Sequence, residues 1–486
     1  MRSANGMLWI IALLSVAPLI WSLQSAWVRL HQPNPQSPWE TEILLDGWRA
    51  SHGLPVYCFL SENDHSTHMY GALITYSVAA IFRATGFNTH AARWISDVAG
   101  VFLIVAILWA FARRHGAFFV FIAATMLMSC FYRARGYFSE GRPDVISIAL
   151  SMVAVWMFYR AFARHTAWIV GGTIVMIVAF FYKQPASAIC AVPGLVVLLL
   201  RPNNLVRKLT LATIPPAAVV ITLVLLKVLA PRIYFFMITG PKLFKMHWDL
   251  LPEDIVTLIT TNTVFVLMFA LWMLGFARSS LSREATVWLL VIVGVETITN
   301  AIARVKEGGQ VNGYLPSYIA MTVFAIAVLP HALSRFAEVA PSTWQRYALA
   351  GLVGCMIFAD TTCFANHARW AFATDMYGDA SYKKVLHRTQ KLKGRVICPD
   401  DPTIPLQAKG YLGRSLQSEI DALGGYPMPS YLPGELARAD YLIRVQGMWT
   451  SHVPGGLLRK KGYVLVKDPA FQGAYSLWKR KHKSAS

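Results

Sequence analysis

Charged residues are scarce in this sequence. They make up 14% of its 486 residues, while 55% are hydrophobic; a soluble protein of this size would carry about 25% charged residues. Many apolar runs reach about 18 residues or more, the length needed to cross about 30 Å of hydrocarbon. The composition excludes an ordinary soluble domain and predicts an α-helical polytopic membrane protein.

Acidic residues are scarcer than basic ones. The chain has 25 acidic and 45 basic residues, which leave a net charge of +20. In a soluble chain this excess would suggest a nucleic-acid partner. No basic run is interleaved with aromatic residues in the way that base stacking requires, so no nucleic-acid partner is expected. In a membrane protein the excess fits lipid headgroups and the positive-inside rule.

Cysteine is also rare. The six cysteines form neither a CxxC pair nor a Cys/His spacing typical of zinc. Cys130, Cys190 and Cys355 lie in apolar runs, so we expect them in the core.

One loop gathers several residue types that bind metals. It contains Glu62, Asp64, His65 and His68, but a single loop is a poor case for a metal site, and a polar loop is the simpler interpretation. We therefore predict no metal ligands and no required cofactor, and leave a divalent cation open.

Eleven apolar runs are predicted to cross the membrane, and no internal repeat relates them. The run 68–85 is shorter, contains Tyr and Thr, and is expected to lie in the membrane interface as a juxtamembrane helix. The predicted spans are 7–28, 94–112, 116–132, 143–160, 167–182, 186–200, 210–230, 255–277, 285–302, 314–331 and 346–363.

Whether 68–85 crosses the membrane or lies in the interface decides the predicted orientation of the protein. With 68–85 in the interface, five basic segments face the cytoplasm, as the positive-inside rule requires. The N-terminus is then cytoplasmic and the C-terminus lies outside an inner or plasma membrane. The five cytoplasmic segments are 112–116, 160–165, 201–208, 277–284 and 334–346.

This orientation places other basic loops on the outer side, where the rule predicts few positive charges. Their basic residues therefore need another explanation. These loops are 133–144, 182–185, 231–254 and 303–314.

The composition changes after about residue 365. The segment "YKKVLHRTQKLKGRVICPDD" indicates an amphipathic helix followed by a short strand, and "ADYLIRV" and "KGYVLVKD" indicate further strands. We predict a transmembrane domain over 1–365 and a small extracytoplasmic α/β domain over 366–486. The final residues, "KRKHKSAS", are expected to form a solvated tail.

The stretch "SPWETEILLDGWRASHGLPVY" places acids beside Trp39, Trp48 and Tyr57, which fit an interfacial aromatic belt. Ser37 and Pro38 match a helix start, and Glu40 suits a capping box. Glu42 and Asp46 share one polar face of that helix, where Asp46 is expected to pair with Arg49. The functional interpretation is that one acid, held at the bilayer surface, acts as a general base.

Cations gather at three outer loop ends. In "RARGYFSEGRPD", Arg135 and Arg142 suit a phosphate at the membrane surface, and Asp144 fits either a helix N-terminus or a functional role. In "FFYKQPAS", Lys183 and Gln184 lie in a tight outer turn, where phosphate binding competes with snorkelling.

The third loop, "ARVKEGGQVNGYLP", contains Arg304, Lys306 and Asn312 beside a Gly-Gly pair that permits close backbone approach. Taken alone, this motif is weak evidence for a binding site.

The order of these motifs resembles the GT-C superfamily of membrane glycosyltransferases. The acid-bearing helix ending in "HGLPVY" is followed by "MYGAL", "GRPD", "KQP" and "GGQVNGYLP". The order looks most like bacterial relatives of protein O-mannosyltransferases and of the aminoarabinose and galacturonic acid transferases of lipid A. The resemblance covers most of the membrane part, and it implies about eleven transmembrane helices plus juxtamembrane helices.

The resemblance also implies an activity. Such enzymes transfer a sugar from a polyprenyl-phosphate donor to an acceptor hydroxyl on a glycan, lipid or protein, with inversion. Counting back from "HGLPVY", Glu40 falls at the superfamily's acidic position and is the first candidate for the general base, with Glu42 second. The candidates for binding substrate and phosphate are His68, Tyr70, Arg135, Arg142, Asp144, Lys183, Gln184, Arg304, Lys306 and Asn312.

Two other classes of protein remain as alternatives. A transporter or flippase for a lipid-linked glycan would need charged residues or broken helices near the bilayer midplane. A non-catalytic scaffold would give no reason for acids and cations to gather at several outer loop ends, and its loops would be scattered.

Overall fold

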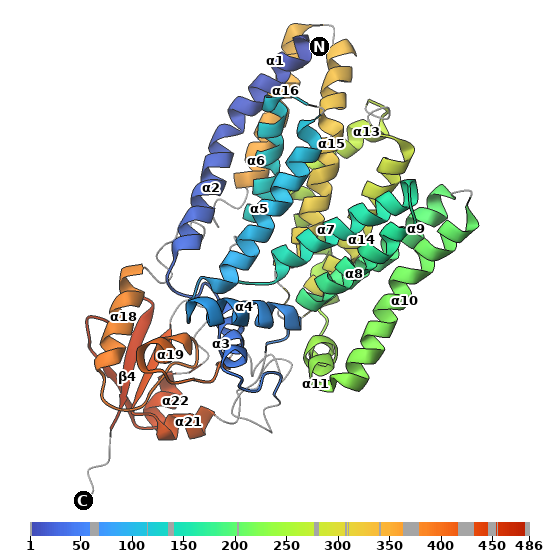
Figure 1. Ribbon diagram of the computed structural model, residues 1–486. Helices are drawn as coiled ribbons and strands as arrows, with labels where there is room; N and C mark the ends of the chain where they lie inside the picture. The colour runs from blue at the N-terminus through green and yellow to red at the C-terminus, as the bar shows by residue number, and fades with distance from the viewer. Residues whose placement is uncertain are drawn as a thin grey trace, which may run out of the picture.

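The computed structural model describes all residues except 1, 59–67, 114, 135–139, 202–203, 277–280, 307–308, 310, 340–341, 363–378, 417–431, 446–452, 454 and 482–486. Helices form a long bundle, and a small mixed domain lies at the end of the bundle opposite the N-terminus (Figure 1). The bundle helices are α1 (Arg2–Leu14), α2 (Val16–His31), α5 (Ala91–Ala112), α6 (Ala117–Arg133), α7 (Asp144–Ala163), α8 (Ala167–Tyr182), α9 (Ala191–Leu200), α10 (Leu205–Leu229), α12 (Leu251–Thr260), α13 (Thr263–Met273), α14 (Arg283–Arg304), α15 (Leu315–Val339) and α16 (Thr343–Thr362).

Each predicted span coincides with one or two of these helices. Within the described residues, six helical segments are long and apolar enough to cross a membrane, or seven if the bent pair α12–α13 is one span. Helices α6, α8 and α9 are apolar but shorter. A multi-pass membrane protein is therefore confirmed, while the number eleven stays a prediction.

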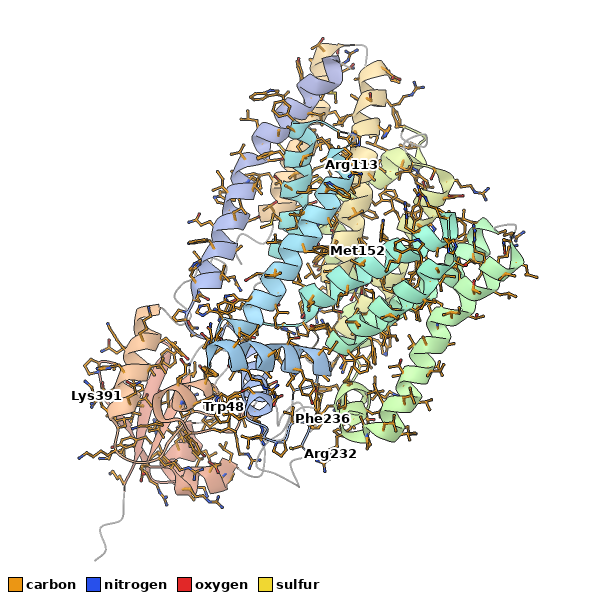
Figure 2. The ribbon with its side chains drawn as sticks, viewed as in Figure 1. Trp48, Arg113, Met152, Arg232, Phe236 and Lys391 are labelled. Carbon is orange, nitrogen blue, oxygen red and sulfur yellow. The ribbon has the colours of Figure 1, made fainter. Side chains whose placement is uncertain are left out.

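Two short helices lie across the end of the bundle next to the C-terminal domain. They are α3 (Pro38–Ser51) and α4 (Ala72–Thr85), and they pack against each other. The position of α4 agrees with the expectation that 68–85 is a juxtamembrane helix. Arg113 lies near the opposite end of the bundle from Arg232, which follows α10 in the short helix α11 (Pro231–Tyr234) (Figure 2).

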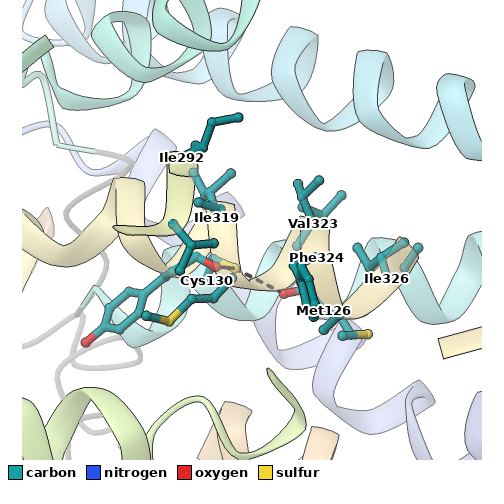
Figure 3. Packing of buried hydrophobic residues seen from close by; sticks show 14 of the residues in the cluster. Met126, Cys130, Ile292, Ile319, Val323, Phe324 and Ile326 are labelled. Atoms are coloured by element: carbon teal, nitrogen blue, oxygen red, sulfur yellow. Dashed lines mark hydrogen bonds between the residues drawn. The ribbon is translucent and has the colours of Figure 1, made fainter. Parts of the chain in front are cut away.

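Helix α15 forms the centre of the bundle. Most of its residues are buried, and it packs against α6, α13 and α14. Figure 3 shows Phe324 and Val323 of α15 beside Met126 and Cys130 of α6. Cys130 is buried as predicted, but Cys355 is exposed on the outside of the bundle, where lipid and not protein would cover it.

One span is broken by a bend of 77° between α12 and α13. Arg133 of α6 donates to the carbonyl of Thr261 (2.8 Å), where α12 ends. Asp360 of α16 accepts hydrogen bonds from the N–H groups of Thr263 (2.9 Å) and Val264 (3.2 Å), where α13 begins. Two charged side chains thus satisfy backbone groups that the break would otherwise leave unpaired inside the membrane.

The C-terminal domain contains a four-stranded mixed sheet of order β1-β2-β4-β3, with β1 parallel to β2 and the other pairs antiparallel. Its apolar faces pack against helices on both sides. Its elements are α18 (Asp379–Lys391), β1 (Val396–Ile397), α19 (Thr403–Lys409), α21 (Leu432–Arg438), β2 (Tyr441–Val445), α22 (Gly455–Lys460), β3 (Tyr463–Val466) and β4 (Tyr475–Arg480).

The predicted helix and three strands of this domain are confirmed as α18, β1, β2 and β3. Strand β4 was not predicted, and it takes in Lys479 and Arg480, so the tail begins later than expected. The boundary at residue 365 lies outside the described residues.

Candidate active site

Helix α3 begins as its sequence predicts. The Ser37 hydroxyl accepts the N–H of Glu40 at 3.2 Å, and Pro38 stands at the first helical position. The Glu40 carboxylate reaches back, but it accepts the N–H of Gln36 at 2.6 Å rather than that of Ser37. The cap fixes the Glu40 side chain at the end of α3 that faces α5.

The partner of Glu40 is Arg93, in the first turn of α5. Arg93 Nε donates to Glu40 Oε1 at 2.6 Å and a second guanidinium nitrogen lies 3.3 Å from Oε2. Both side chains are fully buried, and Arg93 also donates to the carbonyls of Gln32 and Asn34. Arg93 therefore ties α5 to the α2–α3 connection through Glu40, which gives this acid a structural role.

Glu42 lies on another face of α3, against the C-terminal domain. Its side chain is buried, and its Oε1 accepts the Ser415 hydroxyl at 3.4 Å. The domain thus covers the second candidate acid.

Asp46 does not make the predicted pair with Arg49. It accepts the His68 backbone N–H at 3.1 Å and also bonds His68 Nδ1, while Arg49 donates to the Pro55 carbonyl at 2.8 Å. His68 is fully buried, so the predicted substrate-binding histidine instead connects α3 to the start of α4.

The "MYGAL" motif brings α4 against the end of α8. Gly71 donates its N–H to the Tyr182 carbonyl at 3.1 Å, and a Cβ atom at Gly71 would lie 1.9 Å from the Phe181 carbonyl oxygen. Only glycine permits this approach. Gln184 donates to the Met69 carbonyl at 2.7 Å, so two loops far apart in the sequence are joined beside Tyr70.

The "GRPD" and "KQP" motifs meet at Asp144. Its carboxylate pairs with Lys183, accepts the Asn312 amide at 2.9 Å and lies 3.6 Å from Arg142 Nε. Asp144 is buried. One carboxylate therefore aligns three donors that come from three separate loops.

Arg142 is held on its other sides as well. Its guanidinium lies 5.0 Å from the ring centre of Trp39 and 5.5 Å from that of Tyr70, distances at which a cation interacts with an aromatic face. Glu140 Oε2 lies 3.7 Å from Arg142 Nη1. Burial raises the pKa of the Glu140 carboxyl, and the Arg142 charge opposes that shift.

These groups border a cavity of about 310 Å³ at the end of the bundle. Six predicted site residues line it, namely Tyr70, Arg142, Lys183, Gln184, Lys306 and Asn312. Three of the six are cations, and Lys306 Nζ also lies 4.7 Å from the Phe244 ring centre. The cavity can therefore hold an anion against an aromatic and apolar wall.

The sequence analysis missed several residues of this wall. Trp39 was assigned to the interfacial belt, and nothing in the sequence distinguishes Phe244 or Met237 from other outer-loop residues. The wall also includes Met69, Pro185, Pro241, Asn300, Ala303, Gly309 and Gly313.

Other predicted residues lie elsewhere. Arg304 pairs with Asp254 at 3.4 Å and donates to the Gly309 carbonyl at 2.8 Å, so it braces the loop and does not line the cavity. Arg135 lies outside the described residues, as do Glu62, Asp64 and His65. Within the described part of the chain, no group of three or more His, Cys, Asp or Glu side chains could hold a metal ion.

The comparison with solved structures shows a shared fold along almost the whole of both chains. The structure of ArnT from Cupriavidus metallidurans bound to undecaprenyl phosphate matches with a TM-score of 0.57 and 14% identity, over 96% of this chain and 98% of that chain. The apo state of the same protein matches with a TM-score of 0.56 and 16% identity, over 95% and 97%.

A third solved structure shares less of the fold. The Archaeoglobus fulgidus oligosaccharyltransferase matches with a TM-score of 0.44 and 14% identity, over 88% of this chain and 59% of that chain. No family model and no curated protein matches the sequence.

Proposed function

We propose that this protein is a glycosyltransferase that moves a sugar, a hexose or a pentose, from a polyprenyl-phosphate donor to an acceptor hydroxyl. The observation that carries the proposal is the cavity in which Arg142, Lys183 and Lys306 converge. The similar ArnT structure holds undecaprenyl phosphate, which supports a polyprenyl-phosphate ligand for this chain. The reaction would take place on the outer face of the membrane, with the N-terminus cytoplasmic and the C-terminal domain outside.

The cations would stabilise the departing phosphate. When the sugar–phosphate bond breaks, negative charge grows on the phosphate oxygens. Donors that are already oriented stabilise that charge without reorganising. Asp144 keeps Lys183 and Asn312 in place, and the two aromatic rings keep Arg142 in place. Trp39 and Tyr70 offer flat faces on which a sugar ring can pack.

Glu42 is the carboxylate we propose as general base, and Glu40 as its structural neighbour. Both carboxylate oxygens of Glu40 already accept hydrogen bonds from Arg93 and Gln36. Glu42 lies one turn along α3 from Trp39, on the same side of the helix as that cavity-lining ring. A single displacement by the acceptor oxygen, with its proton passing to Glu42, would invert the anomeric centre.

The arrangement of the loops bears on the alternatives. A scaffold would leave the loops scattered, whereas three of them border one cavity. A transporter would use a broken span, and α12–α13 is one. Its charged neighbours Arg133 and Asp360, however, bond the backbone at the break, which favours a structural role for the break.

Parallel substitutions test the assignment of the two acids. Glu42→Gln is expected to leave the protein folded and to lower transfer about 10²–10⁴-fold, the usual contribution of a general base. Glu40→Gln leaves a buried guanidinium without its ion pair, and is expected to destabilise the protein by about 3–5 kcal/mol. Transfer from radiolabelled polyprenyl-phosphate hexoses and pentoses, and thermal unfolding in detergent, are the two measurements. Full activity of Glu42→Gln would overturn its role as base.

The anion site is tested separately by binding undecaprenyl phosphate to the full chain. Lys306→Met should weaken binding about tenfold or more, because a charge-assisted contact is lost. Lys467→Met, at an exposed position of the C-terminal domain, is the matched control and should bind normally. Equal affinity of both variants and the wild type would contradict the proposed phosphate site.

A further inference from the structure

Helix α18 carries a stripe of basic side chains with one sign of charge. The stretch 383–393, "KKVLHRTQKLK", contains no acidic residue. Its apolar side packs into the domain through Tyr382, Val385 and Leu392. Its outward side exposes the side chains that we call the basic stripe, namely Lys383, Lys384, His387, Arg388, Lys391 and Lys393.

Within the described residues, one acid forms an ion pair with the stripe. Asp468 accepts Arg388 Nε at 2.6 Å. A solvated helix face usually mixes both signs, because a surface of one sign repels itself. The remaining lysines therefore indicate an anionic partner.

The position of α18 indicates which partner. Among the described elements the helix is the first after the bundle helix α16. In Figure 1 one end of α18 lies near the lower end of α2, and the helix runs from there along the outer edge of the C-terminal domain, away from the bundle. Figure 2 places Lys391 at the outer border of the domain, away from α3 and the cavity. The stripe thus lies outside the candidate active site and begins near the end of the bundle, from which it extends along the domain.

We propose that the basic stripe of α18 binds the anionic headgroups of the membrane that surrounds the bundle. Several lysines close to an anionic leaflet act together, and their attraction is lost within a Debye length. Contact with headgroups would anchor the C-terminal domain at the membrane surface. It would thereby keep Ser415 against Glu42.

The chain offers a matched control surface. Arg459, Lys460 and Lys461 are also basic and exposed. They belong to or directly follow α22, whose Leu458 packs on the opposite face of the sheet from α18. Charge reversal at the two surfaces changes the net charge by the same amount, so only position differs between the two variants.

The experiment counts lipids bound to the full chain. Wild type, Lys383→Glu/Lys384→Glu/Lys391→Glu and Arg459→Glu/Lys460→Glu/Lys461→Glu are purified in neutral detergent and titrated with phosphatidylglycerol or phosphatidylcholine. Bound lipids are counted by native mass spectrometry. The stripe variant should lose about tenfold in apparent affinity for phosphatidylglycerol, the control variant should match the wild type, and phosphatidylcholine binding should not change. Bundle sites for lipid are the same in all three proteins.

Three outcomes would overturn the proposal. They are unchanged phosphatidylglycerol binding by the stripe variant, an equal loss in the control variant, and displacement of phosphatidylglycerol by an excess of inorganic phosphate, which would assign the stripe to free anions. The variant Lys383→Gln/Lys384→Gln/Lys391→Gln removes charge without reversing it, and replaces the Glu variant if that protein does not fold. None of these outcomes depends on transfer activity.

Discussion

At the scale of single residues, close packing explains why the motifs "MYGAL" and "GRPD" each contain a glycine. Gly71 allows the start of α4 to touch the backbone of α8. Gly141, in "GRPD", lies against Ala92 and Glu40, and a Cβ atom there would be 2.3 Å from the Ala92 Cβ and 3.1 Å from Glu40 Oε1. Both glycines allow parts of the chain to approach beside the cavity.

Gly141→Ala is expected to destabilise the protein, because either α5 or the Glu40–Arg93 pair must move. Overpacking of this kind costs about 1–3 kcal/mol. The control is Gly351→Ala in α16, where a Cβ atom would meet nothing within 4 Å; it should be neutral or slightly stabilising. Thermal unfolding in detergent measures both, and equal melting temperatures would contradict the packing argument.

The sequence singled out the cations that line the cavity, but not the residues that contact the candidate site residues. Arg142, Lys183 and Lys306 stood out because basic residues on the outer side break the positive-inside rule. The partner of Glu40 could not be predicted. Arg93 is 53 residues away, and its choice of acid depends on how α5 packs. Trp39 fits an interfacial aromatic belt, so the sequence alone did not predict that its ring lines the cavity.

At the scale of elements, the length of the apolar runs predicted the helices of the bundle. Of the four strands of the sheet, the sequence predicted three. Strand β4 was missed although, like the predicted β2, it lies between two other strands. Its Leu477 and Trp478 are buried in clusters on opposite faces of the sheet, and its last residues, Lys479 and Arg480, belong to the basic segment that was predicted as the tail. Its place in the sheet is decided by partners distant in sequence.

The broken span makes a prediction about Asp360. Asp360→Asn keeps the shape of the side chain but removes the charge that accepts the hydrogen bonds of Thr263 and Val264. We expect a loss of about 1–3 kcal/mol, as for a buried hydrogen bond to a charged group. Glu338→Gln, in an exposed pair with Arg335, should change stability by less than about 1 kcal/mol. Similar unfolding temperatures of the two variants would contradict the capping role.

At the scale of the whole molecule, the C-terminal domain should respond to pH through Asp401. Burial raises the pKa of this carboxyl from 3.8 to about 6, although Thr403 donates to it. The folded domain therefore holds the proton more tightly than the unfolded chain. The stability that Asp401 contributes is largest below about pH 4. It falls by roughly 3 kcal/mol at most as the pH rises to about 6.

Asp401→Asn should remove this dependence and gain stability, relative to the wild type, above about pH 6. Asp468→Asn is the control, because the stability that the Asp468 carboxylate contributes changes with pH in the opposite direction. Although partial burial raises the pKa of the Asp468 carboxyl, the Ala470 N–H and Arg388 together hold it below its ordinary value, so its contribution is lost as the pH falls. Unfolding of the full chain from about pH 2 to pH 8 checks both variants, and parallel curves for wild type and Asp401→Asn would refute the argument.

The Glu40–Arg93 pair also bears on how the protein is made. Ribosomes deliver α3 well before Arg93, so α3 emerges with an acid whose cation has not yet been synthesised. The first turn of α5 must reach the membrane surface before α3 can settle, and Lys183, Lys306 and Ser415 arrive later still. A chain released early would carry an apolar bundle without a finished cavity. The order of synthesis thus withholds the cavity until the residues up to Gly313 have been made, and the cover over Glu42 until Ser415 follows.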